Sequence, residues 1–216
     1  GGVVVCRPFR RAVGLGEGVA AFRTKEGEQP LKIKLSIERD SAAHETLLLR
    51  SFLRQFSEKF PDEYYDFISK GGDEPDWSKL YPDQWLAATS EALQLELGNA
   101  ASKELLTASL DKIREQYGDR IIVIGGPPCQ AYSLVGRVRN GGNRDYEASK
   151  DDRYFLYREY VAIVERLRPI AFVMENVKGI LSAKLNGNLV FPEILRSLRG
   201  AAGPDSYALT SVSEFR

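Results

Sequence analysis

The stretch that most constrains the fold is a short β-branched run that leads through glycine and proline to a cysteine. Residues 121–133 read Ile-Ile-Val-Ile-Gly-Gly-Pro-Pro-Cys-Gln-Ala-Tyr-Ser. The apolar part predicts a buried strand over residues 120–124. The prolines after it fix φ and remove backbone donors, so the segment is stiff and does not continue as a helix. Cys129 is therefore expected at the carboxyl end of a strand, where open α/β sheets bind their ligands.

A second apolar run, over residues 170–174, leads to Glu175 and Asn176. A thiol and a carboxyl group at neighbouring strand ends can combine nucleophilic addition to a ring with protonation of that ring. Each residue alone also has an ordinary interpretation: a buried inert cysteine, a solvated carboxylate and a turn-forming asparagine. The two segments in this order favour a catalytic site.

Strands and helices alternate along most of the chain. Helices are expected over residues 16–23, 40–56, 102–117, 152–167 and 191–199, and strands over residues 32–37, 120–124, 170–174 and 207–212. This alternation predicts an α/β fold with a doubly wound, mostly parallel sheet. Residues 57–97 follow the alternation poorly but hold many aromatic side chains, which are costly to leave in water. We expect an ordered helical insert there, packed on the edge of the sheet; a surface for DNA or a partner is the alternative.

The composition excludes several classes of function. The charges balance, with 30 Lys and Arg against 30 Asp and Glu, so any contact with nucleic acid depends on a local patch. Cys6 and Cys129 show no metal-ligand spacing, and the single histidine, His44, is interpreted as structural. No signal peptide and no apolar run of membrane-spanning length is visible. We expect a cytoplasmic chain that keeps its thiols reduced and binds no metal and no membrane.

Two motifs resemble those of a known enzyme family. Pro-Cys-Gln at residues 128–130 and Glu-Asn-Val at residues 175–177 match the C5-cytosine-specific DNA methyltransferases, and the resemblance runs from about residue 14 onward. Residues 152–156 look like the family's Asp-Arg-x-x-Leu element. The resemblance implies a Rossmann-like, S-adenosylmethionine-dependent methyltransferase fold. It also implies a catalytic-domain fragment truncated at the C-terminus, because the family's Gln-x-Arg-x-Arg element, target-recognition domain and final helix do not follow.

The resemblance implies roles for the residues near the two motifs. In the family a thiolate adds to C6 of a cytosine flipped out of double-stranded DNA, N3 is protonated, and C5 attacks the methyl group of S-adenosylmethionine. Cys129 matches the nucleophile, and Glu175 matches the group that donates to N3. Asn176 would fix the loop and the carboxyl group, while Pro127 would hold the backbone against the base and the cofactor.

The segment after the cysteine is expected to contact DNA. Residues 131–150 are rich in glycine and in basic side chains and have no apolar periodicity. We expect a mobile lid whose arginines bind phosphates; a solvated surface loop is the alternative. The residues assigned to nucleic-acid contact are Gln130, Ser133, Arg137, Arg139 and Arg144.

The cofactor residues are expected near the early strands. Glu38 follows the strand over residues 32–37, where an acidic residue commonly binds ribose, and it matches the family's cofactor glutamate. Arg39 lies where the family often stacks a side chain on adenine. Asn99 is a candidate for the adenine edge, although the family usually has aspartate there. Leu15 belongs to a stretch that resembles the tail of the family's first motif.

The rest of that first motif, Asp-Leu-Phe-Ala-Gly-x-Gly-Gly, is missing. Codons for residues 6–12, read from the second base of the Cys6 codon, permit Val-Asp-Leu-Phe-Ala-Gly-Pro. We therefore expect residues 1–13 to be a frameshifted relic of the motif and to be irregular. Bulky and cationic residues, Arg7 among them, replace the glycine turn. Binding of S-adenosylmethionine, itself a cation, is then expected to be weak or absent.

These observations favour a DNA (cytosine-5-)-methyltransferase of a restriction-modification system whose first motif is disrupted in this chain. Two alternatives stay open. One is a related cytosine-5 methyltransferase that acts on transfer RNA, and the other is an inactive methyltransferase-like domain that binds DNA or a partner.

Overall fold

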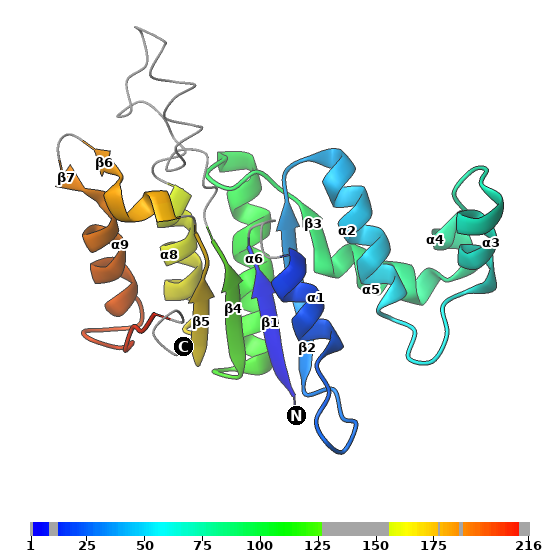
Figure 1. Ribbon diagram of the computed structural model, residues 1–216, viewed down its shortest axis with the longest axis horizontal. Helices are drawn as coiled ribbons and strands as arrows, with labels where there is room; N and C mark the ends of the chain where they lie inside the picture. The colour runs from blue at the N-terminus through cyan, green and yellow to red at the C-terminus, as the bar shows by residue number, and fades with distance from the viewer. Residues whose placement is uncertain (1, 9–12, 127–155, 177, 186–187, 212–216) are drawn as a thin grey trace, which may run out of the picture.

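The structure is a computed structural model that describes residues 2–8, 13–126, 156–176, 178–185 and 188–211. Its main element is a five-stranded sheet with the order β3-β2-β1-β4-β5, and every neighbouring pair of strands is parallel (Figure 1). The strands are β1 (Val3–Arg7), β2 (Leu31–Glu38), β3 (Ala92–Gln94), β4 (Ile121–Gly125) and β5 (Ala171–Met174). The predicted α/β fold with a parallel sheet is confirmed.

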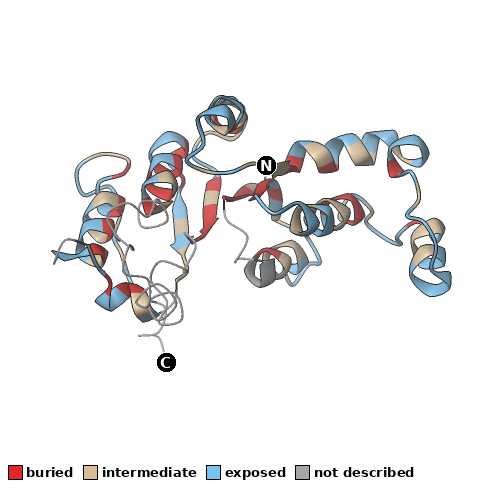
Figure 2. Ribbon diagram, turned by 90° about the horizontal axis from the view of Figure 1, so that it is seen from above, coloured by how far each residue is buried: buried red, intermediate tan, exposed pale blue. Residues whose placement is uncertain are grey.

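Helices flank the sheet (Figure 2). They are α1 (Val13–Ala21), α2 (Ser41–Leu53), α3 (Asp62–Lys70), α4 (Trp77–Leu80), α5 (Pro82–Glu91), α6 (Ala100–Tyr117), α8 (Leu156–Leu167) and α9 (Val190–Arg199). A short 3₁₀ helix, Lys178–Ser182, and a small antiparallel pair, β6 (Lys184–Leu185) with β7 (Asn188–Leu189), separate β5 from α9. The helices expected from the sequence at α1, α2, α6, α8 and α9 are therefore present, within a few residues at their ends.

The largest core lies between the sheet and the helices α6, α8 and α9. Each of these helices presents apolar residues at intervals of three or four, the spacing that places them on one face. The buried positions are Leu106, Leu110 and Ile113 on α6, Tyr157, Tyr160, Val161, Ile163, Val164 and Leu167 on α8, and Val190, Ile194 and Leu198 on α9. The opposite face of the sheet is covered by α1, where Val5 and Ile33 pack against Val19 and Ala20.

The N-terminal segment forms the central strand, so the prediction of irregular structure over residues 1–13 is wrong for its first part. Val3–Arg7 pairs with β2 on one side and with β4 on the other. Val4, Val5 and Cys6 are almost completely buried, at 2%, 1% and 0% exposure. Consecutive β-branched residues that are covered on both faces favour a central parallel strand, whatever codons encode them. Residues 9–12 lie outside the described residues.

The strand expected over residues 207–212 is also absent, because residues 206–211 have no regular secondary structure. Tyr207 instead anchors this segment to β5. Its ring meets that of Phe172 edge-on at 5.0 Å, and its hydroxyl donates to the carbonyl of Pro169 at 2.8 Å. One aromatic anchor thus replaces a ladder of strand hydrogen bonds.

Residues 57–97 contain the helices α3, α4 and α5 and the unexpected edge strand β3. Their aromatic residues gather around Phe52 of α2, whose ring centroid lies 5.0 Å from that of Trp77 and 5.8 Å from that of Trp85. His44 of α2 places Nε2 at 3.1 Å from the carbonyl oxygen of Ala92, which ties α2 to β3. Aromatic packing therefore holds α4 and α5 to α2.

A cation is buried at the end of the central strand. Arg7 is 3% exposed, and a Cβ at Gly16 of α1 would overlap its guanidinium, so this side chain lies directly against the helix. Burial, and then the nearby Arg54, lowers the pKa of Arg7. A lowered pKa means that the folded protein disfavours the charged form, which arginine nevertheless keeps at neutral pH.

Other charged side chains lie close to Arg7. Arg54 donates to Glu91 at 2.6 Å and to Glu17 at 3.2 Å, and Arg50 lies 3.5 Å from Glu17. Among the described residues, Arg7, Arg50 and Arg54 thus lie near the carboxylates of Glu17 and Glu91 in a cluster that joins β1, α1, α2 and α5.

We predict that Arg7→Met raises the free energy of unfolding, by about 1 to 4 kcal/mol, because burial disfavours the charged guanidinium and methionine keeps an apolar stem of similar length. Arg54→Met, the matched control, should lower it by about 3 to 5 kcal/mol, because it removes the guanidinium that pairs with the buried Glu91. Urea unfolding of the variants measures both changes. A loss of stability in Arg7→Met would show that the cluster depends on its third cation.

Candidate functional site

The predicted catalytic segments meet at the carboxyl ends of β4 and β5. Gly125 is the register partner of Met174, and the amide of Glu175 donates to the carbonyl of Gly125 at 3.0 Å. A Cβ at Gly126 would overlap the carbonyl oxygen of Glu175. The backbone that leads toward Cys129 therefore leaves β4 in direct contact with the backbone of Glu175.

Cys129 itself lies outside the described residues, as do Pro127, Gln130, Ser133, Arg137, Arg139 and Arg144. In the sequence, Cys129 follows Gly126 by three positions.

Glu175 carries a carboxylate oxygen that the fold does not use. Its Oε1 is buried and has no hydrogen-bond partner among the described residues, although Glu175 as a whole is only half-buried. Buried polar atoms in native proteins are nearly always paired, and exceptions often mark functional sites. Asn176 follows, also half-buried. The orphaned oxygen indicates a place where a ligand donor can bind.

Glu38 ends β2 and is held by the backbone that follows it. It is 6% exposed, and its Oε1 accepts hydrogen bonds from the amides of Arg39 at 2.9 Å and of Asp40 at 2.8 Å. The Glu38 carbonyl accepts from the amide of Leu95, so the ends of β2 and β3 lie together. The position expected for a ribose-binding carboxylate is thus formed.

The other predicted cofactor residues have structural partners. Arg39 is exposed, and its Nη1 pairs with Glu96 Oε1 at 3.1 Å. Asn99 is the N-cap of α6, with its side-chain oxygen accepting from the amide of Ala101 at 2.9 Å. Leu15 lies in α1, but its side chain is outside the description. Helix capping therefore accounts for Asn99 without a ligand.

Two residues of this edge were not singled out from the sequence. Glu96 escaped notice because the short strand before it was not predicted, although an acidic residue after a strand is the usual signal. Gly126 has no separate signal in the sequence, because it is one of two glycines between the strand and the prolines. Its role appears when β5 is placed beside β4, since the contact joins residues distant in the sequence.

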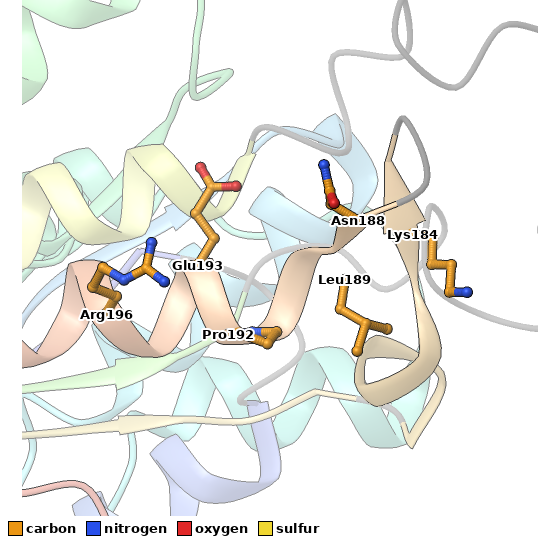
Figure 3. A pocket seen from close by; sticks show the side chains of 6 residues that line it. All are labelled: Lys184, Asn188, Leu189, Pro192, Glu193 and Arg196. Carbon is orange, nitrogen blue, oxygen red and sulfur yellow. The ribbon is translucent and has the colours of Figure 1, made fainter.

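A surface hollow lies elsewhere, beside α9 and the β6–β7 pair (Figure 3). It is lined by Lys184, Asn188, Leu189, Pro192, Glu193 and Arg196. None of the predicted site residues lines it. Within the described ranges, no group of three or more His, Cys, Asp or Glu side chains could hold a metal ion, and no helix is long and apolar enough to cross a membrane.

Comparison with known proteins agrees with the motifs at the ends of β4 and β5. Residues 99–203 match the family model described as C-5 cytosine-specific DNA methylase, and this range includes Cys129 and Glu175. The chain belongs to this family. Methylases of the family use S-adenosylmethionine and act on DNA. No solved structure matches the chain.

Named relatives are bacterial and archaeal methylases. Type II methyltransferase M.Bpa9945I of Bacillus paralicheniformis is 32% identical over 198 residues, which cover 84% of this chain and 42% of the relative. Type II methyltransferase M.DdeI of Desulfomicrobium norvegicum is 44% identical over 73 residues, or 34% of this chain and 15% of the relative. DNA (cytosine-5-)-methyltransferase M.ApeKI of Aeropyrum pernix is 40% identical over 77 residues, or 36% and 15%. The chain thus spans less than half the length of these methylases.

The close approach at Gly126 leads to a testable prediction. Gly126→Ala should lower the free energy of unfolding by about 1 to 3 kcal/mol, because the added Cβ forces the ends of β4 and β5 apart. Gly18→Ala in α1, where a Cβ would meet no atom within 4 Å, should instead raise it by about 0.5 to 1 kcal/mol. Urea unfolding compares the two. Equal effects of both substitutions would mean that the contact with Glu175 imposes no constraint.

Proposed function

We propose that this chain carries the base-activating site of a DNA (cytosine-5-)-methyltransferase, of the kind that serves restriction-modification systems. The observation that carries this proposal is the buried Oε1 of Glu175, which has no hydrogen-bond partner among the described residues. It belongs to a residue whose backbone contacts Gly126, three positions before Cys129 in the sequence. A flipped cytosine would bring a donor or acceptor edge to that oxygen while its ring carbon meets the thiol. The M.ApeKI relative, named as a cytosine-5 methyltransferase, supports the same choice of base.

The proposed chemistry begins with addition of the Cys129 thiolate to C6 of cytosine. As the carbon–sulfur bond forms, the electrons of the C5–C6 double bond move toward N3, which takes a proton from Glu175. C5 is then an enamine-like nucleophile. A proton from water can add at C5, and the original C5 hydrogen then leaves as a proton. Return of the N3 proton to Glu175 lets the C5–C6 double bond re-form with expulsion of the thiolate, which returns cytosine with its C5 hydrogen exchanged.

The second cysteine does not compete for this role. Cys6 is 0% exposed in the centre of the sheet, and burial raises the pKa of its thiol to about 12. A buried thiol of that pKa stays protonated at neutral pH and is inert as a nucleophile. Thiol chemistry in this chain therefore falls to Cys129.

The ends of β2 and β1 differ in how well they would accommodate S-adenosylmethionine. Glu38 is suitably placed for a ribose, since it is buried at the end of β2 with its carboxylate oriented by backbone amides. The end of β1 does not suit the cofactor, because Arg7 fills the space against Gly16 with a positive charge. A cationic sulfonium gains nothing from that neighbour. We propose that this chain binds S-adenosylmethionine weakly, and that the chemistry of the chain stops at activation of the base.

Hydrogen exchange at C5 tests the activation step without any cofactor. The full chain, in excess over duplex DNA that carries tritium at C5 of cytosine, should release tritium into water. Cys129→Ser should abolish the release, and Glu175→Gln should slow it by about 10²-fold or more, the usual effect of losing a general acid. Cys6→Ala is the control and should keep the rate. Release that persists in Cys129→Ser would overturn the nucleophile, and transfer RNA as the better substrate would favour the alternative enzyme.

Calorimetry tests the proposed weak binding of S-adenosylmethionine. The chain should give no measurable heat with S-adenosylmethionine, whereas a variant with residues 6–12 replaced by Val-Asp-Leu-Phe-Ala-Gly-Pro should bind at least about tenfold more tightly, which corresponds to about 1.4 kcal/mol. The substitution exchanges Arg7 for aspartate and restores a glycine turn. Micromolar binding by the unaltered chain would contradict the proposal.

A further inference from the structure

The carboxyl end of β5 is held by a tyrosine that no motif of the sequence includes. Tyr160 lies on α8 and is 0% exposed. Its hydroxyl donates to the carbonyl of Val173 at 3.1 Å, and its ring packs edge-on against Phe172 at 6.3 Å. Val173 precedes Glu175 by two residues. The phenol therefore contacts the main chain immediately before the predicted proton donor.

This contact matters because β5 is the edge strand of the sheet. It pairs with β4 alone, and its residues are exposed or only half-buried. An edge strand has unpaired main-chain groups on its outer side and is less constrained than a central one. Tyr160 provides a hydrogen bond from the helix layer, while the bond from Glu175 to Gly125 provides one from β4. Together they restrain both ends of the segment Val173-Met174-Glu175.

We infer that Tyr160 is a positioning residue for Glu175, because it holds the main chain that carries this carboxylate at the end of β5. This inference rests on the function proposed above. The hydroxyl is the informative part of the side chain, since phenylalanine would fill the same volume. Burial raises the pKa of Tyr160, so the hydroxyl stays protonated and can donate at neutral pH.

Tyr207, which contacts the other end of β5, offers a matched control. Its hydroxyl also donates to a main-chain carbonyl, that of Pro169 at 2.8 Å, but at the amino end of β5. Tyr160→Phe and Tyr207→Phe thus remove the same chemical group from opposite ends of one strand. A purely structural role predicts similar consequences for both variants.

The test is tritium release from C5-labelled cytosine in duplex DNA by the full chain. Tyr160→Phe should lower the rate at saturating DNA by about ten- to a hundredfold with the half-saturating DNA concentration unchanged, because misplacement of a reacting group acts on the chemical step. Tyr207→Phe should leave both values unchanged. Equal rates in the two variants would overturn the inference.

Amide hydrogen exchange separates this inference from the proposed function. Tyr160→Phe should speed exchange of the Glu175 amide, while Tyr207→Phe should not. If the unaltered chain releases no tritium, the proposed function fails, and the amide measurement still decides whether Tyr160 holds Glu175. An unchanged Glu175 amide in Tyr160→Phe would overturn the positioning role, whatever the activity of the chain.

Discussion

The pairing of β1 with strands on both sides holds this molecule together. β1 joins β2 to β4, and without it the pair β2–β3 would have no connection within the sheet to the pair β4–β5. Its inner residues are buried on both faces, so apolar area removed from water stabilises the junction. Because all five strands of this sheet are parallel, the junction also brings their carboxyl ends to one edge. The candidate site depends on that alignment.

The two halves of this edge differ in how completely they are formed. At β4 and β5, main-chain contacts and the Tyr160 hydroxyl restrain Glu175 next to the segment that carries Cys129. At β1 and β2, Glu38 is held by backbone amides, and the buried guanidinium of Arg7 lies at the end of the neighbouring strand, against Gly16. The two ends of this edge therefore differ in charge as well as in hydrogen bonding.

Much of the fold was predictable because hydrophobic periodicity and β-branched runs indicate the strands and helices directly. The contact between the ends of β4 and β5, the strands that lead to the two motifs, followed from one rule: parallel strands end at the same edge of a sheet. The failures have separate causes. β1 was not predicted because the possible frameshift was given more weight than the three consecutive valines of that segment. β3 was not predicted because three residues are too few to show a hydrophobic pattern. The prediction of a strand at Tyr207 was wrong because this residue anchors the segment through its ring and its hydroxyl. The contact of Tyr160 could not be predicted because its partner is a main-chain carbonyl, which no sequence pattern identifies.

The use of main-chain atoms at the ends of β4 and β5 explains how the site can carry chemistry at all. The contacts that bring Glu175 to Gly125 and Gly126 involve backbone groups only, so the carboxylate is not consumed by the fold. Glu38 shows the opposite arrangement, because one of its oxygens accepts two backbone amides and helps to shape the turn after β2. The backbone amides after β2 therefore orient the Glu38 carboxylate, whereas main-chain contacts alone place Glu175 beside the end of β4.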